Sequence, residues 1–493
     1  MRDARDTAID YGDVQGLVRF GYGHLTESCF VLLRIAEPAA ARAWLAAAPV
    51  TTAVKGEPPA TALNVAFTRE GLEALGVPGE VIAGFSPEFV SGMAGDESRS
   101  RRLGDVDASA PSGWRWGGPE RAPHVIVLLY AKPGLLAGWR QTVQGQWGGA
   151  FEVLELLAVA DLDFYEPFGF RDGVSQPEID WDRRRKLDGS DVLAYTNLIA
   201  LGELLLGYPN EYGKYTDRPL LDANEANDGA AAELPVAEDA AGRRDLGRNG
   251  TYLVLRELRQ DVRGFWQFLD GQAGGDHQQA QRLGAAMLGR TLQGEPLIPL
   301  SNQPIPGVGP DPEDVQYNQF TYASDANGAR CPFGAHVRRA NPRNADLPDG
   351  TRGLFQRLLR TLGFDLPGFR DDLISSSRFH RLWRRGRDFG SGDDDRGLHF
   401  IALNANIERQ FEFVQNAWVE DTKFGGLTDE SDGVLGDRQP IPGGARTDTF
   451  SLPREDGVRR RLTGLPQFVT VQGGAYFFLP GMRALHYIAS AGR

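Results

Sequence analysis

Residues 29–35 read CFVLLRI, residues 38–48 read PAAARAWLAAA and residues 61–67 read TALNVAF. The first and third stretches are short apolar runs rich in branched residues, which predicts two strands. The second begins with proline and continues with alanine, which predicts a helix. Residues 68–75, TREGLEAL, predict another helix with Thr68 as its N-cap. This alternation indicates an α/β or α+β sandwich with helices on one face of a sheet.

Further strands are predicted on both sides of this region. The candidates are GLVRFG at 16–21, VIVLLYA at 125–131 and TYLVLRE at 251–257, and a helix is predicted at 261–269. Residues 180–250 are rich in Asp, Asn, Glu, Ala and Gly, so we expect surface loops that join two halves of the chain.

The composition is that of an ordinary globular protein with an acidic balance. The 493 residues carry 53 basic and 66 acidic side chains, for a formal charge of −13. This charge argues against a general nucleic-acid binder and against an anionic membrane surface as partner. The length is compatible with three domains or with two larger ones.

Several classes of protein lose support because their sequence signals are missing. No segment approaches the roughly 18 consecutive apolar residues of a spanning helix. The N-terminus, MRDARDTAIDYGD, has neither an apolar signal region nor a twin-arginine signal, so a cytoplasmic location is expected. The only cysteines are Cys29 and Cys331, which excludes a disulfide framework and a CxxCH haem-attachment site. HExxH, GxSxG, P-loop and GxGxxG patterns are also absent from the sequence.

One segment with chemical potential is DFYEPFGFRDGVSQP at 163–177. Asp172 lies between Gly169 and Gly173 and follows three phenylalanines. The glycines allow a backbone to approach a flat ligand closely. The aromatic setting is expected to remove water from the Asp172 carboxylate, as suits a general acid or base. The alternative is an aspartate that caps a glycine turn, which is common.

A second segment is CPFGAHVRRANPR at 331–343. His336 follows a Pro-Phe-Gly turn and precedes two arginines. A single histidine in such a turn suits the iron of a haem, and the arginines suit its propionates. The alternatives are a structural histidine and a Cys331 thiolate ligand, although Cys331 is more typical of a small packed side chain.

A third segment is RFHRLWRRGRDFG at 378–390. If it is a strand, alternation puts His380, Leu382 and Arg384 on one face, and Arg381, Trp383 and Arg385 on the other.

Together these segments resemble the dye-decolourising peroxidases, of the larger and mostly bacterial type. GFRDG at 169–173 is similar to the distal GxxDG motif of that family. CPFGAHVRRANPR is similar to its proximal-histidine segment, and LWRRGRDFG at 382–390 is similar to its distal-arginine strand. Similar stretches extend over nearly the whole chain, from residues 13–25 to residues 397–415.

The resemblance implies an α+β fold that composition alone does not give. Two ferredoxin-like halves, antiparallel sheets with helices, would form a dimeric α+β-barrel-like unit. Residues 1–245 would be the half with the GxxDG motif, and residues 246–493 would be the half that holds non-covalent haem b.

The resemblance also implies roles for individual residues. His336 would be the iron ligand, Asp172 the distal acid and base, and Arg384 the distal arginine. A carboxylate is expected behind His336, with Glu408 and Glu412 as candidates. The remaining predicted cofactor-binding residues are Gly169, Phe170, Arg171, Gly173, Ser175 and Arg338.

The implied function is the reduction of hydrogen peroxide with one-electron oxidation of dyes, phenols or other aromatic donors. The alternative is a haem-binding or haem-iron-handling protein without enzymatic activity, which would need His336 but neither Asp172 nor Arg384. A protein that keeps only the fold is a third possibility. The sequence leaves the oligomeric state and the use of manganese open.

Overall fold

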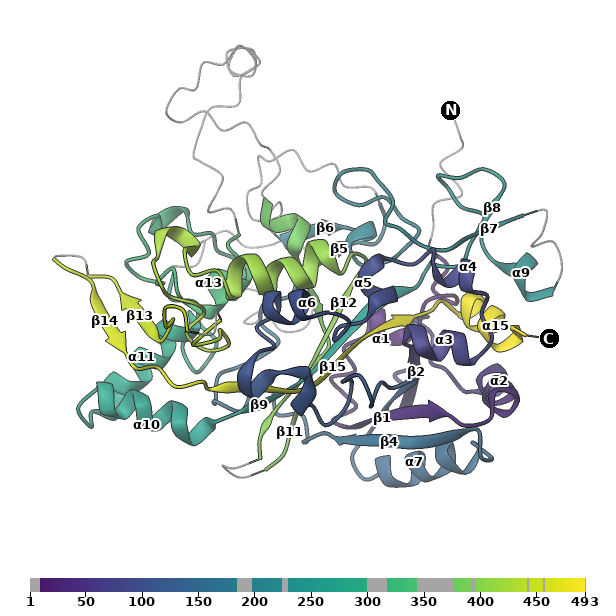
Figure 1. Cartoon of the computed structure of the whole chain (residues 1–493), viewed down its shortest axis with the longest axis horizontal. Helices are drawn as coiled ribbons and strands as arrows, with labels where there is room; N and C mark the ends of the chain where they lie inside the picture. The colour runs from purple at the N-terminus through teal and green to yellow at the C-terminus, as the bar shows by residue number, and fades with distance from the viewer. Residues whose placement is uncertain are drawn as a thin grey trace, which may run out of the picture.

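The computed structural model describes residues 9–183, 197–223, 229–298, 317–343, 376–391, 395–440, 443–454 and 457–492. Its centre is a sheet of nine strands in the order β10-β12-β9-β15-β2-β3-β1-β4, with β11 paired to β12 (Figure 1). All of these pairs are antiparallel. The strands are β1 (Glu27–Ile35), β2 (Thr61–Phe67), β3 (Val125–Ala131), β4 (Phe151–Ala158), β9 (Thr251–Gln260), β10 (Trp383–Arg384), β11 (Arg387–Phe389), β12 (Gly397–Asn404) and β15 (Val469–Leu479).

Strands from the two ends of the chain share this sheet. β1 to β4 form one side, β9 to β12 and β15 form the other, and β2 meets β15 at Phe67 and Phe478. The predicted α+β class with two ferredoxin-like halves is confirmed. Within the described residues the sheet is open, running from β10 to β4 without closing into a barrel. The predicted boundary at residue 245 falls between β8 (Arg243–Asp245) and β9, and it stays a prediction.

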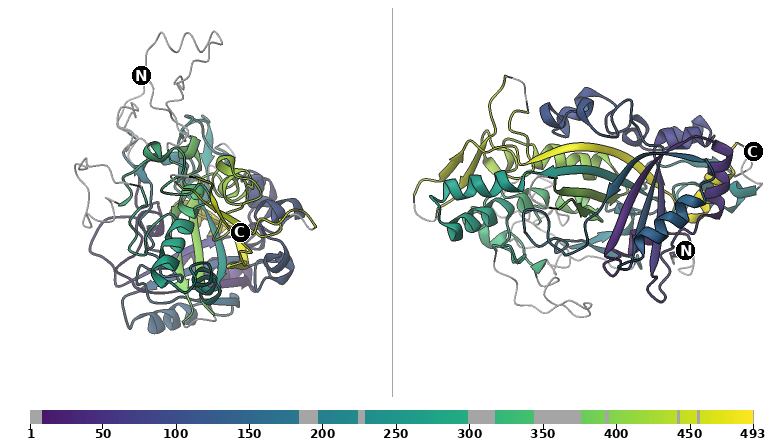
Figure 2. Two further views of the ribbon diagram at one scale, coloured as in Figure 1. Left: turned by 90° about the vertical axis from the view of Figure 1, so that its left-hand side faces the viewer. Right: turned by 90° about the horizontal axis from the view of Figure 1, so that it is seen from below.

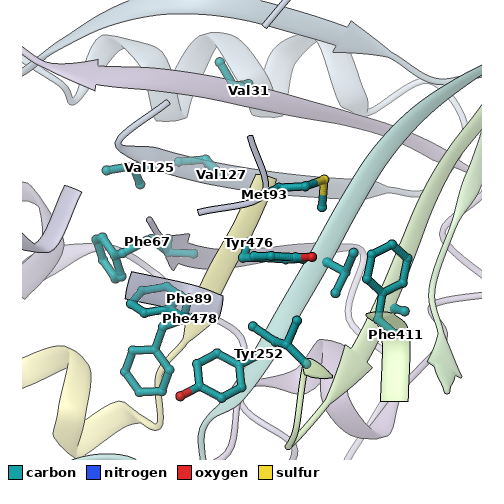
Figure 3. Packing of buried hydrophobic residues seen from close by; sticks show 14 of the residues in the cluster. Val31, Phe67, Phe89, Met93, Val125, Val127, Tyr252, Phe411, Tyr476 and Phe478 are labelled. Carbon is teal, nitrogen blue, oxygen red and sulfur yellow. The ribbon is translucent and has the colours of Figure 1, made fainter. Parts of the chain in front are cut away.

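Most strands of the sheet are buried on both faces, which explains why they read as continuous apolar runs. Val31 and Val127 pack in one hydrophobic core, and their neighbours Phe30 and Ile126 pack in the other. Figure 3 shows part of the first core, to which strands far apart in sequence contribute Val31, Val127 and Tyr476. The predicted strands at 29–35, 61–67, 125–131 and 251–257 are therefore confirmed.

Helices α10 and α11 lie at one end of the sheet and α2 and α15 at the other (Figures 1 and 2). The predicted cap at Thr68 is confirmed, because its side chain accepts from the N–H of Gly71. The helices are α1 (Gly16–Arg19), α2 (Pro38–Ala47), α3 (Arg69–Ala74), α4 (Gly79–Ile82), α5 (Pro87–Ser91), α6 (Glu97–Arg102), α7 (Leu136–Gly145), α9 (Gly229–Glu233), α10 (Val262–Gln272), α11 (His277–Leu288), α13 (His336–Ala340) and α15 (Met482–Ser490). In the part of the chain that the structure describes, no helix is long and apolar enough to cross a membrane.

Two predicted elements differ from the structure. Residues 16–19 form the helical turn α1 instead of a strand, because Phe20 donates its N–H back to Gly16 and closes the turn. The region 180–250 is more than surface loops in its described parts, 180–183, 197–223 and 229–250, since Leu204, Leu205 and Tyr208 pack in the second core. The short strands of this region are β5 (Glu178–Asp180), β6 (Leu198–Ala200), β7 (Leu220–Asp222) and β8.

Candidate active site

The GxxDG segment forms a tight turn after β4. The N–H of Gly169 donates to the carbonyl of Glu166 at 2.7 Å, and the N–H of Glu166 donates to the carbonyl of Phe170 at 2.9 Å. Gly169 and Gly173 have φ angles of 95° and 82°, a left-handed conformation that favours glycine. A Cβ atom at either position would meet open space. Backbone conformation therefore accounts for glycine at both positions, and the close approach of a flat ligand stays a prediction.

Asp172 is fixed through its backbone, since its N–H donates to the carbonyl of Phe164 at 2.9 Å. Its side chain is 39% exposed, and Oδ1 lies 3.6 Å from an Nη atom of Arg384. The three phenylalanines do not remove the Asp172 carboxylate from water as expected. Phe168 and Phe170 are buried and line the same cavity, but Phe164 is largely exposed and the Asp172 side chain keeps its exposure. An exposed carboxylate beside a guanidinium can accept a proton from a small molecule placed between them.

Arg384 lies beside Asp172 because side chains alternate between the two faces of a strand. It pairs with Ala402 of β12, and Ala402 faces the first core. Gln176 holds the Arg384 backbone on both sides, accepting from its N–H at 3.2 Å and donating to its carbonyl at 3.1 Å. The Arg384 guanidinium also donates to the carbonyl of Ser175 at 3.2 Å. The strand therefore delivers Arg384 to the Asp172 turn.

The neighbouring arginine points to the opposite face, as the alternation predicts. Arg385 donates to the carbonyls of Leu17 and Val18, and its guanidinium lies 4.4 Å from the ring centre of Trp383. His380 does not belong to this strand, contrary to our prediction. It ends the 3-10 turn η5 (Ser376–His380), where its ring stacks on Phe413 at 3.7 Å.

His336 begins helix α13, and its Nδ1 atom lies 3.0 Å from Oδ2 of Asp432. Burial acts to lower the pKa of His336, whereas the charge and hydrogen bond of Asp432 raise it, and the net direction is upward. Burial acts to raise the pKa of Asp432, but His336 and Arg339 outweigh it, so this pKa is lowered. Because Nδ1 is engaged, Nε2 is the nitrogen left for a metal.

Asp432, and neither of the two predicted glutamates, is the carboxylate behind His336. Glu412 instead accepts from the Tyr476 hydroxyl at 2.9 Å and pairs with Arg99 at 2.8 Å, while Glu408 is exposed. Sequence reasoning missed Asp432 because it lies in an irregular loop. The available signal was its Asp-Gly pair, typical of a turn in which the side chain accepts backbone N–H groups. The Oδ1 atom of Asp432 does accept from two such groups, the backbone N–H groups of Val434 and Leu435.

Glu166 is a second carboxyl that sequence reasoning missed. Its Oε1 accepts from the N–H of Phe170 at 2.9 Å, and its Oε2 accepts from the N–H of Phe168 at 3.0 Å and from Gln260 at 2.9 Å. Burial raises the pKa of Glu166 to about 7, although these donors act in the other direction. Glu166 therefore ties the Asp172 turn to strand β9.

One cavity is lined by the distal and the proximal groups together. Of the predicted site residues, those that line it are Phe170, Arg171, Asp172, Ser175, His336 and Arg384. Gly169, Gly173 and Cys331 are absent from the lining. Apolar walls come from α11, β12 and the loop after Asp432, through Leu288, Leu398, Phe400, Val434 and Leu435.

Arg338 does not reach the cavity, which corrects its predicted role. Its guanidinium pairs with Asp325 at 2.9 Å and donates to the carbonyl of Cys331 at 2.7 Å. Cys331 itself is buried as a small packed side chain, as its alternative interpretation suggested.

Other arginines give the cavity a cationic edge. Arg290 and Arg381 line it together with Arg384. The predicted placement of Arg381 on the opposite face is wrong, because Arg381 precedes β10 and does not follow the alternation of the strand. Burial, and after it the charge of Arg343, lowers the pKa of Arg290 to about 9, and the same two causes lower that of Arg381 to about 9. Arg290 donates to the neutral oxygens of Ser175, Gly294 and Tyr317. Such crowded cations suit a ligand with more than one negative charge.

The chain is similar to known peroxidases over most of its length. It is 28% identical over 454 residues to a dye-decolorizing peroxidase of Mycetinis scorodonius, covering 88% of this chain and 77% of that one. It is also 28% identical over 457 residues to the multifunctional dye peroxidase of an Amycolatopsis species, covering 86% of this chain and 81% of that one. No family model matches the chain.

Solved structures share the fold. The crystal structure of a decolorizing peroxidase from Auricularia auricula-judae superposes with a TM-score of 0.68 at 24% identity, covering 98% of this chain and 100% of that one. A dye-decolorizing peroxidase in complex with 2,6-dimethoxyphenol superposes with a TM-score of 0.67 at 22% identity, covering the same shares.

Proposed function

We propose that this chain, a member of the dye-decolorizing peroxidase family, holds a non-covalent haem b on His336 and uses Asp172 and Arg384 to reduce hydrogen peroxide. The observation that carries this proposal is that the His336–Asp432 pair and the Asp172–Arg384 pair line one cavity. The donors oxidised in exchange are dyes and phenols.

The residues of the cavity fit a haem. A planar macrocycle needs apolar walls, which Leu288, Leu398 and Phe400 offer. Its two carboxylates need cations, which Arg290 and Arg381 offer at one edge. Its iron needs an imidazole, which His336 offers through Nε2. Both cysteines are buried outside the lining of the cavity, which supports non-covalent binding.

When bound, the haem would supply the redox chemistry, namely the two electrons that cleavage of the peroxide bond requires and that the organic donor restores. The Asp172 carboxylate accepts the proton of the inner peroxide oxygen at an Oδ atom and delivers it to the outer oxygen, so that water leaves. The Arg384 guanidinium donates hydrogen bonds to the leaving oxygen and stabilises its negative charge. Asp432 holds the His336 ring through Nδ1 and so fixes its orientation.

Phenols are proposed as donors because a similar structure contains 2,6-dimethoxyphenol. Bulky dyes would reach the buried cavity only through an aromatic relay on the surface. Trp383 lies on the opposite face of the strand from Arg384 and donates to the carbonyl of Val18 at 2.8 Å. This packing is that of an ordinary core aromatic, so the structure favours no particular relay residue.

The test combines a spectrum with an assay. Protein purified with haem is expected to show a Soret band and to bleach a dye only when peroxide is added. A Soret band without bleaching would indicate haem binding without peroxidase activity. The lack of any Soret band after addition of haem would contradict the proposal.

A further inference from the structure

Arg339 is a buried cation that the proposed reaction does not use. It lies on α13 three residues after His336, and it is fully buried. Its guanidinium donates to four backbone carbonyls, those of Trp418 at 2.7 Å, Val419 at 3.4 Å, Asp421 at 2.9 Å and Glu430 at 2.6 Å. The Arg339 side chain thus joins α13, the helix of His336, to residues 418–421 and to Glu430, which lies two positions before Asp432.

Arg438 holds the same loop from its other end. Its guanidinium donates to the carbonyl of Asp432 at 2.9 Å, to that of Gly433 at 2.8 Å and to that of Pro466 at 3.0 Å. Glu430, Ser431 and Asp432 are all fully buried. The loop that carries Asp432 is therefore fixed on both sides by guanidinium groups bonded to its backbone.

Both guanidinium groups donate to the backbone of the loop and not to the Asp432 carboxylate. Neither arginine forms a side-chain ion pair with Asp432, whose Oδ2 is left to the His336 ring. Their effect on His336 is therefore exerted through the position of Asp432.

We propose that Arg339 and Arg438 are positioning residues for the His336–Asp432 pair and that, by fixing this pair, they lower the reduction potential of the iron bound to His336. This inference rests on the proposed haem function. A carboxylate that accepts from Nδ1 makes Nε2 more basic, and a more basic ligand favours ferric over ferrous iron. If the loop relaxes, the hydrogen bond weakens and the potential rises.

Arg338 provides a matched control on the same helix. It is as deeply buried as Arg339 but is directed to Asp325, away from the Asp432 loop. Replacement by methionine keeps an unbranched apolar stem in each case, removes the guanidinium group and with it every donated hydrogen bond, and shortens the three side chains equally. Arg338→Met should therefore lower stability without affecting the His336–Asp432 pair.

The experiment is a spectroelectrochemical titration of the haem-loaded protein and its variants. Arg339→Met and Arg438→Met are expected to raise the midpoint potential, and Arg338→Met is expected to leave it unchanged. Asp432→Asn is the reference variant, and its midpoint potential should rise by more than that of either arginine variant. Unfolding temperature and haem content are recorded for every variant, because all three arginine replacements are expected to lower stability.

Several outcomes would overturn the inference. An equal shift in all three arginine variants would mean that loss of stability, and not the Asp432 loop, moves the potential. An unchanged potential in Arg339→Met and Arg438→Met would also contradict it, and Arg438→Met carries the test if Arg339→Met does not fold. If the unchanged protein binds no haem, the proposed function fails first, and the inference fails with it.

Discussion

The Nδ1 atom of His336 lies 3.0 Å from Oδ2 of Asp432, although 96 positions separate the two residues in the chain. This contact orients the imidazole so that Nε2 is available to the cavity that Asp172 and Arg384 also line. A histidine held in this way by a carboxylate is a typical metal ligand. The contact therefore connects the fold of the loop around Asp432 with the chemistry proposed for the cavity.

Removal of the imidazole should abolish haem binding. His336→Ala is expected to purify with little haem, because His336 is the one histidine among the described residues that line the cavity. The ratio of Soret to protein absorbance measures this loss. His399→Ala is the control, since His399 is buried between Phe30 and Phe389 and does not line the cavity. A normal Soret band in His336→Ala would exclude the assignment.

Replacement of the adjacent residues Arg384 and Arg385 should have very different effects on the rate of reaction with peroxide. Arg384→Leu is expected to slow the reaction with peroxide by about 10²–10³-fold, the usual effect of losing one donor aimed at developing charge. Arg385→Leu should change this rate little, because its side chain bonds to Leu17 and Val18 on the other face. Stopped-flow mixing with peroxide compares them. The reverse order of effects would show that Arg385 is the distal arginine.

Glu166→Ala should loosen the Asp172 turn. The change leaves the N–H groups of Phe168 and Phe170 and the amide of Gln260 without their acceptor. Each unsatisfied buried donor costs about 1–3 kcal/mol, so the three together are expected to lower the free energy of unfolding by about 3–9 kcal/mol. Denaturant titration measures it, and the peroxide rate should fall in parallel. A variant with unchanged stability and rate would show that Glu166 does not hold the turn.

Glu420 should make the protein less stable at high pH. Burial raises its pKa to about 8, compared with about 4.3 for an exposed glutamate. The folded protein therefore binds the extra proton between these values, and this group's contribution to stability falls as pH rises from about 4.3 to 8. Glu420→Gln should raise the free energy of unfolding at pH 8 by about 1 kcal/mol or more, with little change at pH 4.5. Unfolding at both pH values, with exposed Glu57→Gln as control, tests this, and equal effects at both would contradict it.

The parts of the structure that follow local rules were predictable from the sequence. The strands at 29–35, 61–67 and 125–131 are unbroken apolar runs, and both of their faces are buried. Alternation along a strand separates Arg384 from Arg385, and the resemblance to the distal-arginine strand selects Arg384. His336 and Asp172 stood out because glycine turns and aromatic residues flank them.

The partners of these residues depend on tertiary contacts that leave no periodic signal. Asp432 lies in a loop, so helical spacing pointed instead to Glu408 and Glu412. Arg338 seemed suited to a propionate, but burial beside Asp325 takes its guanidinium in another direction. Arg290 reaches the cavity only because α11 ends beside it.

The rate at which peroxide reacts with Asp172→Asn tests the account most directly. Asparagine keeps the shape of the side chain but cannot accept the peroxide proton and return it. Stopped-flow spectra of the haem-loaded protein, recorded over a range of peroxide concentrations, give the second-order rate constant. We expect a normal Soret band before mixing and a rate constant about 10²–10⁴-fold below that of the unchanged protein. A haem-loaded Asp172→Asn that reacts at the unchanged rate would contradict the proposed mechanism.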